Sequence, residues 1–323
     1  MTYKKQLTVL SGIVATLTLL YILTFIFDPD RMGSRVDAYS WLDPSLKGRI
    51  DGITITSSGE ETIVLARRGG EWFVSRGGKD YPARSLRIDD FIDSLTKRAP
   101  YPVRSSSASS HERLGLTDYS ATRIRVTGGA GLPLLSLMIG QGDAMGQNIY
   151  LRKEGQNEVR SGEDIFSAYA RSTVASWYNL RLFPESENGR LDVSGVQSLT
   201  VYPSADEGGN TRSYTFTRNG REWDISGMEI ENPNMRNIDN YIRDIINTAG
   251  DDFDNTISAS DPMFNDSRIM LELGDGSVRT IRLGPPEDDG RRLALVSGSD
   301  FVYSIPAWAG SQLFAEPYYF ESD

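Results

Sequence analysis

Apolar residues form one uninterrupted run near the start of the chain. Residues 7–27 read LTVLSGIVATLTLLYILTFIF, without a charge, and their Ser and Thr hydroxyls can bond back to a helix backbone. At about 1.5 Å per residue, a helix of about 20 residues crosses a hydrocarbon core of about 30 Å. The run exceeds the roughly 7–15 apolar residues of a signal peptide, and DPDR follows it instead of a small-residue cleavage site. We therefore expect a retained transmembrane helix over 7–27, with the lipid bilayer as its partner.

Positive charges on the two sides of this run are nearly balanced. Lys4 and Lys5 precede it, and Arg31 and Arg35 follow it closely. The charge count alone therefore leaves both orientations open. Because only six residues precede the run, a cytoplasmic tail over 1–6 is the simpler arrangement. We expect a single-pass protein of the inner (cytoplasmic) membrane whose C-terminal domains are extracytoplasmic, in the periplasm.

After a juxtamembrane connector over 28–48, short runs that alternate apolar and polar residues predict β-strands. The first three, separated by turns that contain glycine, fall at 53–56, 62–66 and 71–74. The next stretch, SLRIDDFIDSLTKRA, has the periodicity of a helix whose apolar side carries Leu86, Phe91, Ile92 and Leu95. A polar loop, two more strand pairs and a helix near 162–171 complete the pattern.

The second half of the chain repeats this order. GGEWFVS around Trp72 matches NGREWDIS around Trp223, and LRIDDFIDSL matches RNIDNYIRDII. The predicted hairpin TRIRVTGGAGLPLLSLMIG at 122–140 matches SRIMLELGDGSVRTIRLG at 267–284. A unit of about 140 residues has the size of a domain, and two copies predict paired domains rather than a solenoid.

Runs of strands interrupted by single helices favour an α+β class with mainly antiparallel sheet. We predict a transmembrane helix followed by two tandem repeats, each with one or two helices, over 49–183 and 184–323. Apolar residues in the junction at 171–190 predict a packed connector and not a free linker.

Composition narrows the possible partners and sites. The formal net charge is −10 and the chain has no cysteine and one histidine. An acidic chain lacks the basic footprint of nucleic-acid binding, so we expect no nucleic-acid partner. Without cysteine there is no disulfide, thiolate nucleophile or cysteine zinc site, and one histidine excludes sites that need two or three.

Four short stretches could carry chemistry, and each has a simpler interpretation. His111 lies among serines but without a nucleophile elbow, so we expect it in a surface loop. GQGDAMG at 140–146 precedes a predicted strand and lacks GK[ST], which favours a hairpin loop over a phosphate loop. DDFDN at 251–255 and PPEDDG at 285–290 lack EF-hand spacing; we interpret them as solvated loops, with a weak calcium site as the alternative.

Trp72 and Trp223 could stack on a sugar or a peptide, but their equivalent positions in the two repeats favour core anchors. We assign no catalytic, cofactor-binding or metal-binding residue and expect no cofactor. The chain is therefore not predicted to be an enzyme.

The order of these features resembles a family classed as a domain of unknown function. It consists of an N-terminal anchor, strands that end in Trp, an amphipathic helix, a loop with LGL at 114–116, a hairpin that closes on IG, and a strand that ends in VR or VYSI. Members of this family often accompany ABC-type transporters of the gliding-motility kind as an auxiliary extracytoplasmic subunit. The resemblance implies an envelope location and implies no reaction. In the second copy DPMFNDS replaces LGLTDYSAT, which would confine a role of this loop to the first copy.

Three functions follow from this sequence. The leading one is a membrane-anchored extracytoplasmic interaction or accessory subunit of an ABC-type (gliding-like) transporter complex, with its permease or auxiliary subunits as partners. The second is an envelope binding module for a glycan or peptide, and the weakest is an anchored hydrolase that uses carboxylates.

Overall fold

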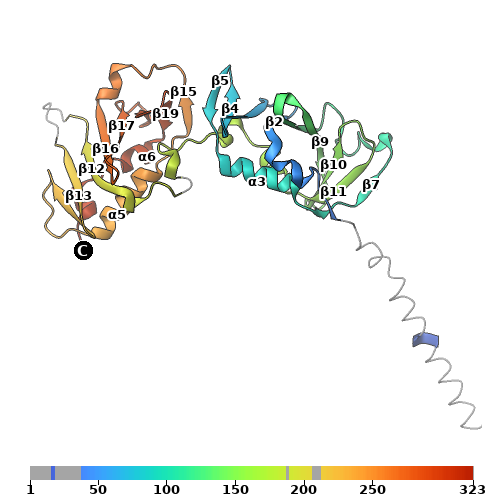
Figure 1. Cartoon of the computed structure of the whole chain (residues 1–323), viewed down its shortest axis with the longest axis horizontal. Helices are drawn as coiled ribbons and strands as arrows, with labels where there is room; N and C mark the ends of the chain where they lie inside the picture. Colours follow the sequence, from blue (N-terminus) through green and yellow to red (C-terminus); the bar gives the residue numbers. More distant parts are fainter. Residues whose placement is uncertain (1–15, 19–37, 187–188, 206–211, 323) are drawn as a thin grey trace, which may run out of the picture. The chain divides into compact units, whose positions relative to one another are not determined.

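The computed structural model describes residues 16–18, 38–186, 189–205 and 212–322 (Figure 1). Residues 16–18 are helical, and the rest of the transmembrane helix predicted over 7–27 lies outside the described residues, as do the tail over 1–6 and residues 28–37 of the connector. In the described parts of the chain, no helix has both the length and the apolar character needed to cross a bilayer.

The chain divides into two compact units. Unit 1 comprises Met1–Glu71 and Leu86–Thr173, and unit 2 comprises Trp72–Ser85 and Val174–Asp323. The chain therefore passes from one unit to the other before the boundary predicted at 183/184. Residues 72–85, which the sequence pattern places in the first repeat, belong to unit 2 by their contacts.

A nine-stranded sheet begins the fold, and its described pairings are antiparallel. Its order is β5-β4-β3-β2-β8-β9-β10-β11-β7. The strands are β2 (Ile50–Thr56), β3 (Ile63–Arg68), β4 (Glu71–Arg76), β5 (Lys79–Pro82), β7 (Val103–Ser105), β8 (Thr122–Gly128), β9 (Pro133–Gly142), β10 (Asn148–Lys153) and β11 (Val159–Glu163).

An eight-stranded antiparallel sheet follows, in the order β14-β13-β12-β16-β17-β18-β19-β15. Its strands are β12 (Val196–Tyr202), β13 (Tyr214–Asn219), β14 (Glu222–Ser226), β15 (Asp252–Asp254), β16 (Ser267–Leu273), β17 (Val278–Leu283), β18 (Arg292–Val296) and β19 (Val302–Ile305). This order reproduces that of the first sheet strand by strand, except that β5 has no counterpart. The fold is thus mixed, with large antiparallel sheets and few helices.

The longer helices bury one face each. In α3 (Ser85–Thr96) the buried apolar residues are Ile88, Phe91, Ile92 and Leu95, as the periodicity predicts. Leu86 was expected on the same side, but its side chain is 52% exposed. At 3.6 residues per turn, Leu86 lies half a turn away from Leu95, so the two cannot share a face.

The corresponding helix of unit 2, α5 (Met235–Asn247), begins after the N-cap Asn234 and packs against β14, α6 (Ala307–Gln312) and η8 (Pro317–Phe320). The remaining short helices of the described chain are η1 (Pro44–Arg49), η2 (Ala108–Ser110), η3 (Gly129–Gly131), α4 (Ser167–Ala170), η4 (Val174–Trp177), η5 (Pro184–Ser186), η6 (Val193–Gly195) and η7 (Pro262–Asn265).

Two connecting segments are packed into the units. The strand β1 (Ala38–Tyr39) pairs with β6 (Ala99–Pro100), and Trp41 and Leu42 are buried directly after it. In the predicted junction, Trp177 and Phe183 are buried as well, which confirms a packed connector.

Candidate functional site

A network of polar contacts in unit 1 surrounds residues 111–121, which we call the LGL loop. Leu116 is fully buried and packs with Ala121, Met138 of β9 and Val159 of β11. The backbone N–H of Gln141 donates to the Leu114 carbonyl at 3.0 Å. The loop therefore lies directly on the sheet.

Two glycines make this close approach possible. Gly115 has a φ of +69°, a left-handed conformation that favours glycine. A Cβ atom at Gly140 would lie 2.3 Å from the Leu114 carbonyl oxygen. The LGL and IG motifs of the sequence are therefore the two sides of one contact.

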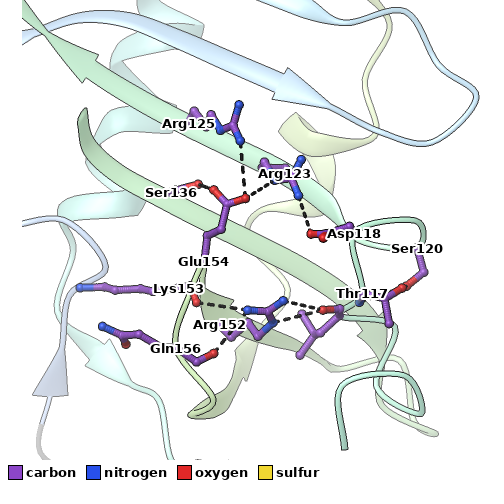
Figure 2. A network of polar contacts seen from close by, with 11 residues as sticks. Thr117, Asp118, Ser120, Arg123, Arg125, Ser136, Arg152, Lys153, Glu154 and Gln156 are labelled. Atoms are coloured by element: carbon purple, nitrogen blue, oxygen red, sulfur yellow. Dashed lines mark hydrogen bonds and ion pairs between the residues drawn. The ribbon is translucent and has the colours of Figure 1, made fainter. Parts of the chain in front are cut away.

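Arg152 of β10 fastens the loop from a second direction (Figure 2). Its Nε and Nη2 atoms donate to the Leu116 carbonyl at 3.1 and 3.0 Å. Its Nη1 atom donates to the carbonyls of Lys153, at 3.5 Å, and Gln156, at 3.3 Å. One guanidinium thus donates to backbone carbonyls from two segments, the loop and the end of β10, and joins them.

A carboxylate network continues along the same strands (Figure 2). Glu154 accepts from the Ser136 hydroxyl at 2.5 Å and forms ion pairs with Arg123 at 3.0 Å and Arg125 at 3.5 Å. Arg123 also forms an ion pair with Asp118 of the loop at 2.7 Å. The Ser136 hydrogen bond, followed by the two arginine charges, lowers the pKa of Glu154, while partial burial opposes this. Glu154 is therefore an ionised structural group and a poor general acid.

The tip of the loop faces solvent although its base is fixed. Tyr119 is 88% exposed. Beside it, the hydroxyls of Thr117 and Ser120 lie 2.7 Å apart, and the backbone N–H of Ala121 donates to the Thr117 carbonyl at 3.0 Å. An exposed aromatic side chain on a preorganised loop is typical of a protein contact, because tyrosine is enriched in interfaces and loses little entropy there.

Comparison with known families identifies this chain. A family model described as a domain of unknown function, DUF4340, matches residues 72–259, more than half of the chain. The chain belongs to the DUF4340 family. The match includes the LGL loop and both strands beneath it, β9 and β10. Comparisons with curated proteins and with solved structures give no match.

Unit 2 of this DUF4340 chain fills the corresponding place differently. There η7 buries Phe264 against Leu293, Leu295 and Val302. A Cβ atom at Gly284, the counterpart of Gly140, would lie 2.7 Å from the Met263 side chain. Phe264 and Met263 of η7, which we call the apolar plug, thus occupy the place of the LGL loop. This agrees with the departure of DPMFNDS from the family pattern.

The stretches that the sequence singled out have structural roles. The Nε2 atom of His111 lies 3.2 Å from the Asn157 carbonyl oxygen. Of the stretch 140–146, residues 140–142 end β9, and 143–147 form the hairpin turn that joins β9 to β10. Trp72 and Trp223 are buried, and the Trp223 indole donates to Asp239 at 2.9 Å, as expected of core anchors.

The two acidic stretches were expected to be loops. Residues 285–290 do connect β17 with β18, but Asp252–Asp254 of 251–255 form the edge strand β15, because Phe253 is buried and the segment pairs with β19. In 251–255, Asp254 accepts from the Thr256 hydroxyl at 2.8 Å and from the Ile257 N–H at 3.0 Å. In 285–290, Asp289 forms an ion pair with Arg291 at 3.2 Å. Among the described residues, no group of three or more His, Asp or Glu side chains is placed to hold a metal ion.

Sequence reasoning missed Arg152, Glu154 and Tyr119. Arg152 and Glu154 stand in an ordinary charged strand end, LRKEG, and Arg152 lies 36 positions from the carbonyl that it binds. The only sequence signal for this site was the LGL motif, which places two leucines in a polar loop; Leu116 is buried and Leu114 is partly buried.

Proposed function

We propose that this DUF4340 chain is a membrane-anchored extracytoplasmic accessory subunit of an ABC-type transporter complex of the gliding-motility kind. In this proposal residues 7–27 span the inner membrane, and two tandem copies of one α+β unit lie in the periplasm. The apolar run and the features shared with the family support this location. The role is a protein contact and not a reaction.

The observation that carries the proposal is the LGL loop. A loop that served only to connect η2 with β8 would not need a buried Leu116, a bidentate Arg152 and an Asp118–Arg123 ion pair. These contacts fix the backbone on both sides of Tyr119, which itself is exposed. Preorganisation of this kind lowers the entropic cost of binding a partner.

The short connector between the proposed membrane helix and unit 1 is consistent with a partner that lies at the membrane. Ten residues, 28–37, separate the proposed membrane helix from β1, which pairs with β6. Fully extended, they reach about 35 Å. Arg98 further stabilises the position of β1, because its Nε and Nη2 atoms donate to the Ala38 carbonyl at 3.3 and 3.1 Å.

Co-purification from membranes in mild detergent tests the proposal. The full-length chain should recover an ABC permease or its ATPase, and Tyr119→Ala should reduce that recovery at least tenfold. Tyr318→Ala is the matched control, because Tyr318 is 76% exposed but lies in η8 of unit 2. Recovery of the chain alone, under conditions that keep other transporter complexes whole, would contradict the proposal.

A further inference from the structure

A polar cavity of about 250 Å³ opens in unit 1 beside the LGL loop. Residues from five places in the sequence line it: the edge strand β7, the loop, the β9–β10 turn, and strands β10 and β11. The polar ones on which the argument depends are Arg104, Arg113, Asp143, Asn148, Tyr150 and Ser161. Sites for small molecules are usually about 300–1,000 Å³, so this cavity suits a ligand smaller than a drug-sized one.

Two guanidinium groups line this cavity. The Arg104 Nε atom donates to the Ser161 hydroxyl at 2.7 Å, which orients the side chain, and Ser161 itself is buried. The two terminal nitrogens of Arg104 have no hydrogen-bond partner among the described residues. The guanidinium group of Arg113 has none there either. Each of these groups can therefore donate hydrogen bonds to a ligand.

One acid also lines the cavity, but its oxygens are already engaged. Asp143 accepts from the Asn148 side-chain amide at 2.8 Å and from the Gln147 N–H at 3.0 Å. The Asn148 hydrogen bond is the main reason that the pKa of Asp143 is lowered, so this carboxylate is ionised at neutral pH. The lining residues carry two positive charges and one negative charge, and the unused donors outnumber the unused acceptors.

The corresponding edge of unit 2 has a different chemistry. There β15 reads DFD where β7 reads VRS, and each strand pairs with the last strand of its sheet. The middle residue of β15 is Phe253, whereas the middle residue of β7 is Arg104, and the Phe253 ring centroid lies 5.0 Å from that of Tyr303. The cationic cavity is thus a feature of unit 1.

We infer that this cavity binds an oxyanion, a phosphate or carboxylate carried by a ligand of about the size of a monosaccharide. Arginine favours such groups because its planar donors match two oxygens at once. The Tyr150 hydroxyl, for which the described chain provides no partner, offers a further donor to a hydroxylated ligand. This inference goes beyond the transporter contact and does not depend on it.

Calorimetric titration of the purified full-length chain in detergent tests the inference. The probes are glucose 6-phosphate, glucuronate, inorganic phosphate and, as the neutral match, glucose. Glucose 6-phosphate or glucuronate should bind saturably, and glucose should not. The oxyanion that binds identifies the ligand chemistry, and binding of inorganic phosphate alone would show that the sugar contributes nothing and would overturn the assignment of a sugar-sized ligand.

Variants locate the site. Arg113→Gln, whose side chain has no described partner to lose, should weaken binding at least tenfold without lowering the melting temperature. Arg104→Gln should weaken binding similarly, and Arg236→Gln, an equal charge change on an exposed residue of α5, should not. Unchanged affinity in both Arg104 and Arg113 variants, or no saturable binding of any anionic probe at millimolar concentration, would overturn the inference.

Discussion

The LGL loop can approach β9 closely because Gly140 has no Cβ atom. A Cβ atom there would lie 2.3 Å from the Leu114 carbonyl oxygen and 2.9 Å from the Leu116 side chain. The backbone oxygen cannot yield as a flexible side chain could, so the loop would have to move. Movement would also displace the Leu116 carbonyl from Arg152.

Gly140→Ala should therefore destabilise unit 1 by about 1–3 kcal/mol, the usual range for overpacking. Urea unfolding of the full-length chain in detergent measures the change. Gly48→Ala is the control, because a Cβ atom at Gly48 meets nothing within 4 Å, and its effect should stay within about 0.5 kcal/mol. Equal stabilities of the two variants would show that the contact between the LGL and IG motifs does not fix the loop.

Among the elements of unit 1, the Glu154 carboxylate links three neighbouring strands, β8, β9 and β10. Glu154 follows the last residue of β10 and interacts with Arg123 and Arg125 of β8 and with Ser136 of β9. Its side chain is partly solvated, so each ion pair contributes modestly. Because the pKa of Glu154 is lower in the folded chain, the unfolded chain binds the proton more readily, and acid favours unfolding.

Replacing Glu154 with Gln should lower the free energy of unfolding by about 0.5–1 kcal/mol at pH 7. The contribution is present above the unfolded pKa of about 4.3 and disappears as the pH falls through the lower folded pKa, so the difference between variant and parent should shrink at pH 3. Urea midpoints at both pH values measure it. Glu112→Gln, the same substitution at an exposed loop residue, is the control and should leave the urea midpoint at pH 7 unchanged. A difference for Glu154→Gln that persists unchanged at pH 3 would contradict this role.

Much of the element pattern could be predicted from sequence, because alternation and helical spacing are local. The hairpins at 122–140 and 267–284 are formed by β8–β9 and β16–β17. The short edge strands β5, β7 and β15 were missed, since three or four residues carry too little periodicity. The prediction that Leu86 is buried was wrong, because nine residues of helix place Leu86 and Leu95 on opposite faces.

The candidate site was only partly predictable for a different reason. The LGL motif marked the loop, but its partners lie on strands that the fold brings together. Arg104 and Ser161, which help to line the cavity, are 57 positions apart. Two arginines in separate polar stretches give no sequence signal until β7 and the loop are placed beside the same strands.

At the scale of the whole molecule, the two sheets have the same strand order but differ in the segments at their edges. The sheets share their strand order, while unit 1 has the LGL loop and the strand VRS, and unit 2 has the apolar plug of η7 and the strand DFD. We therefore place both the protein contact and the oxyanion site in unit 1.

Site-specific photocrosslinking in intact cells tests the central claim most directly. A photoreactive residue at position 119 of the full-length chain should crosslink to an extracytoplasmic part of an ABC transporter subunit, identified by mass spectrometry. The same residue at position 318, which is similarly exposed in unit 2, should not give that product. Absence of the transporter crosslink at 119, or an equal yield at 318, would contradict the claim that the LGL loop is the contact.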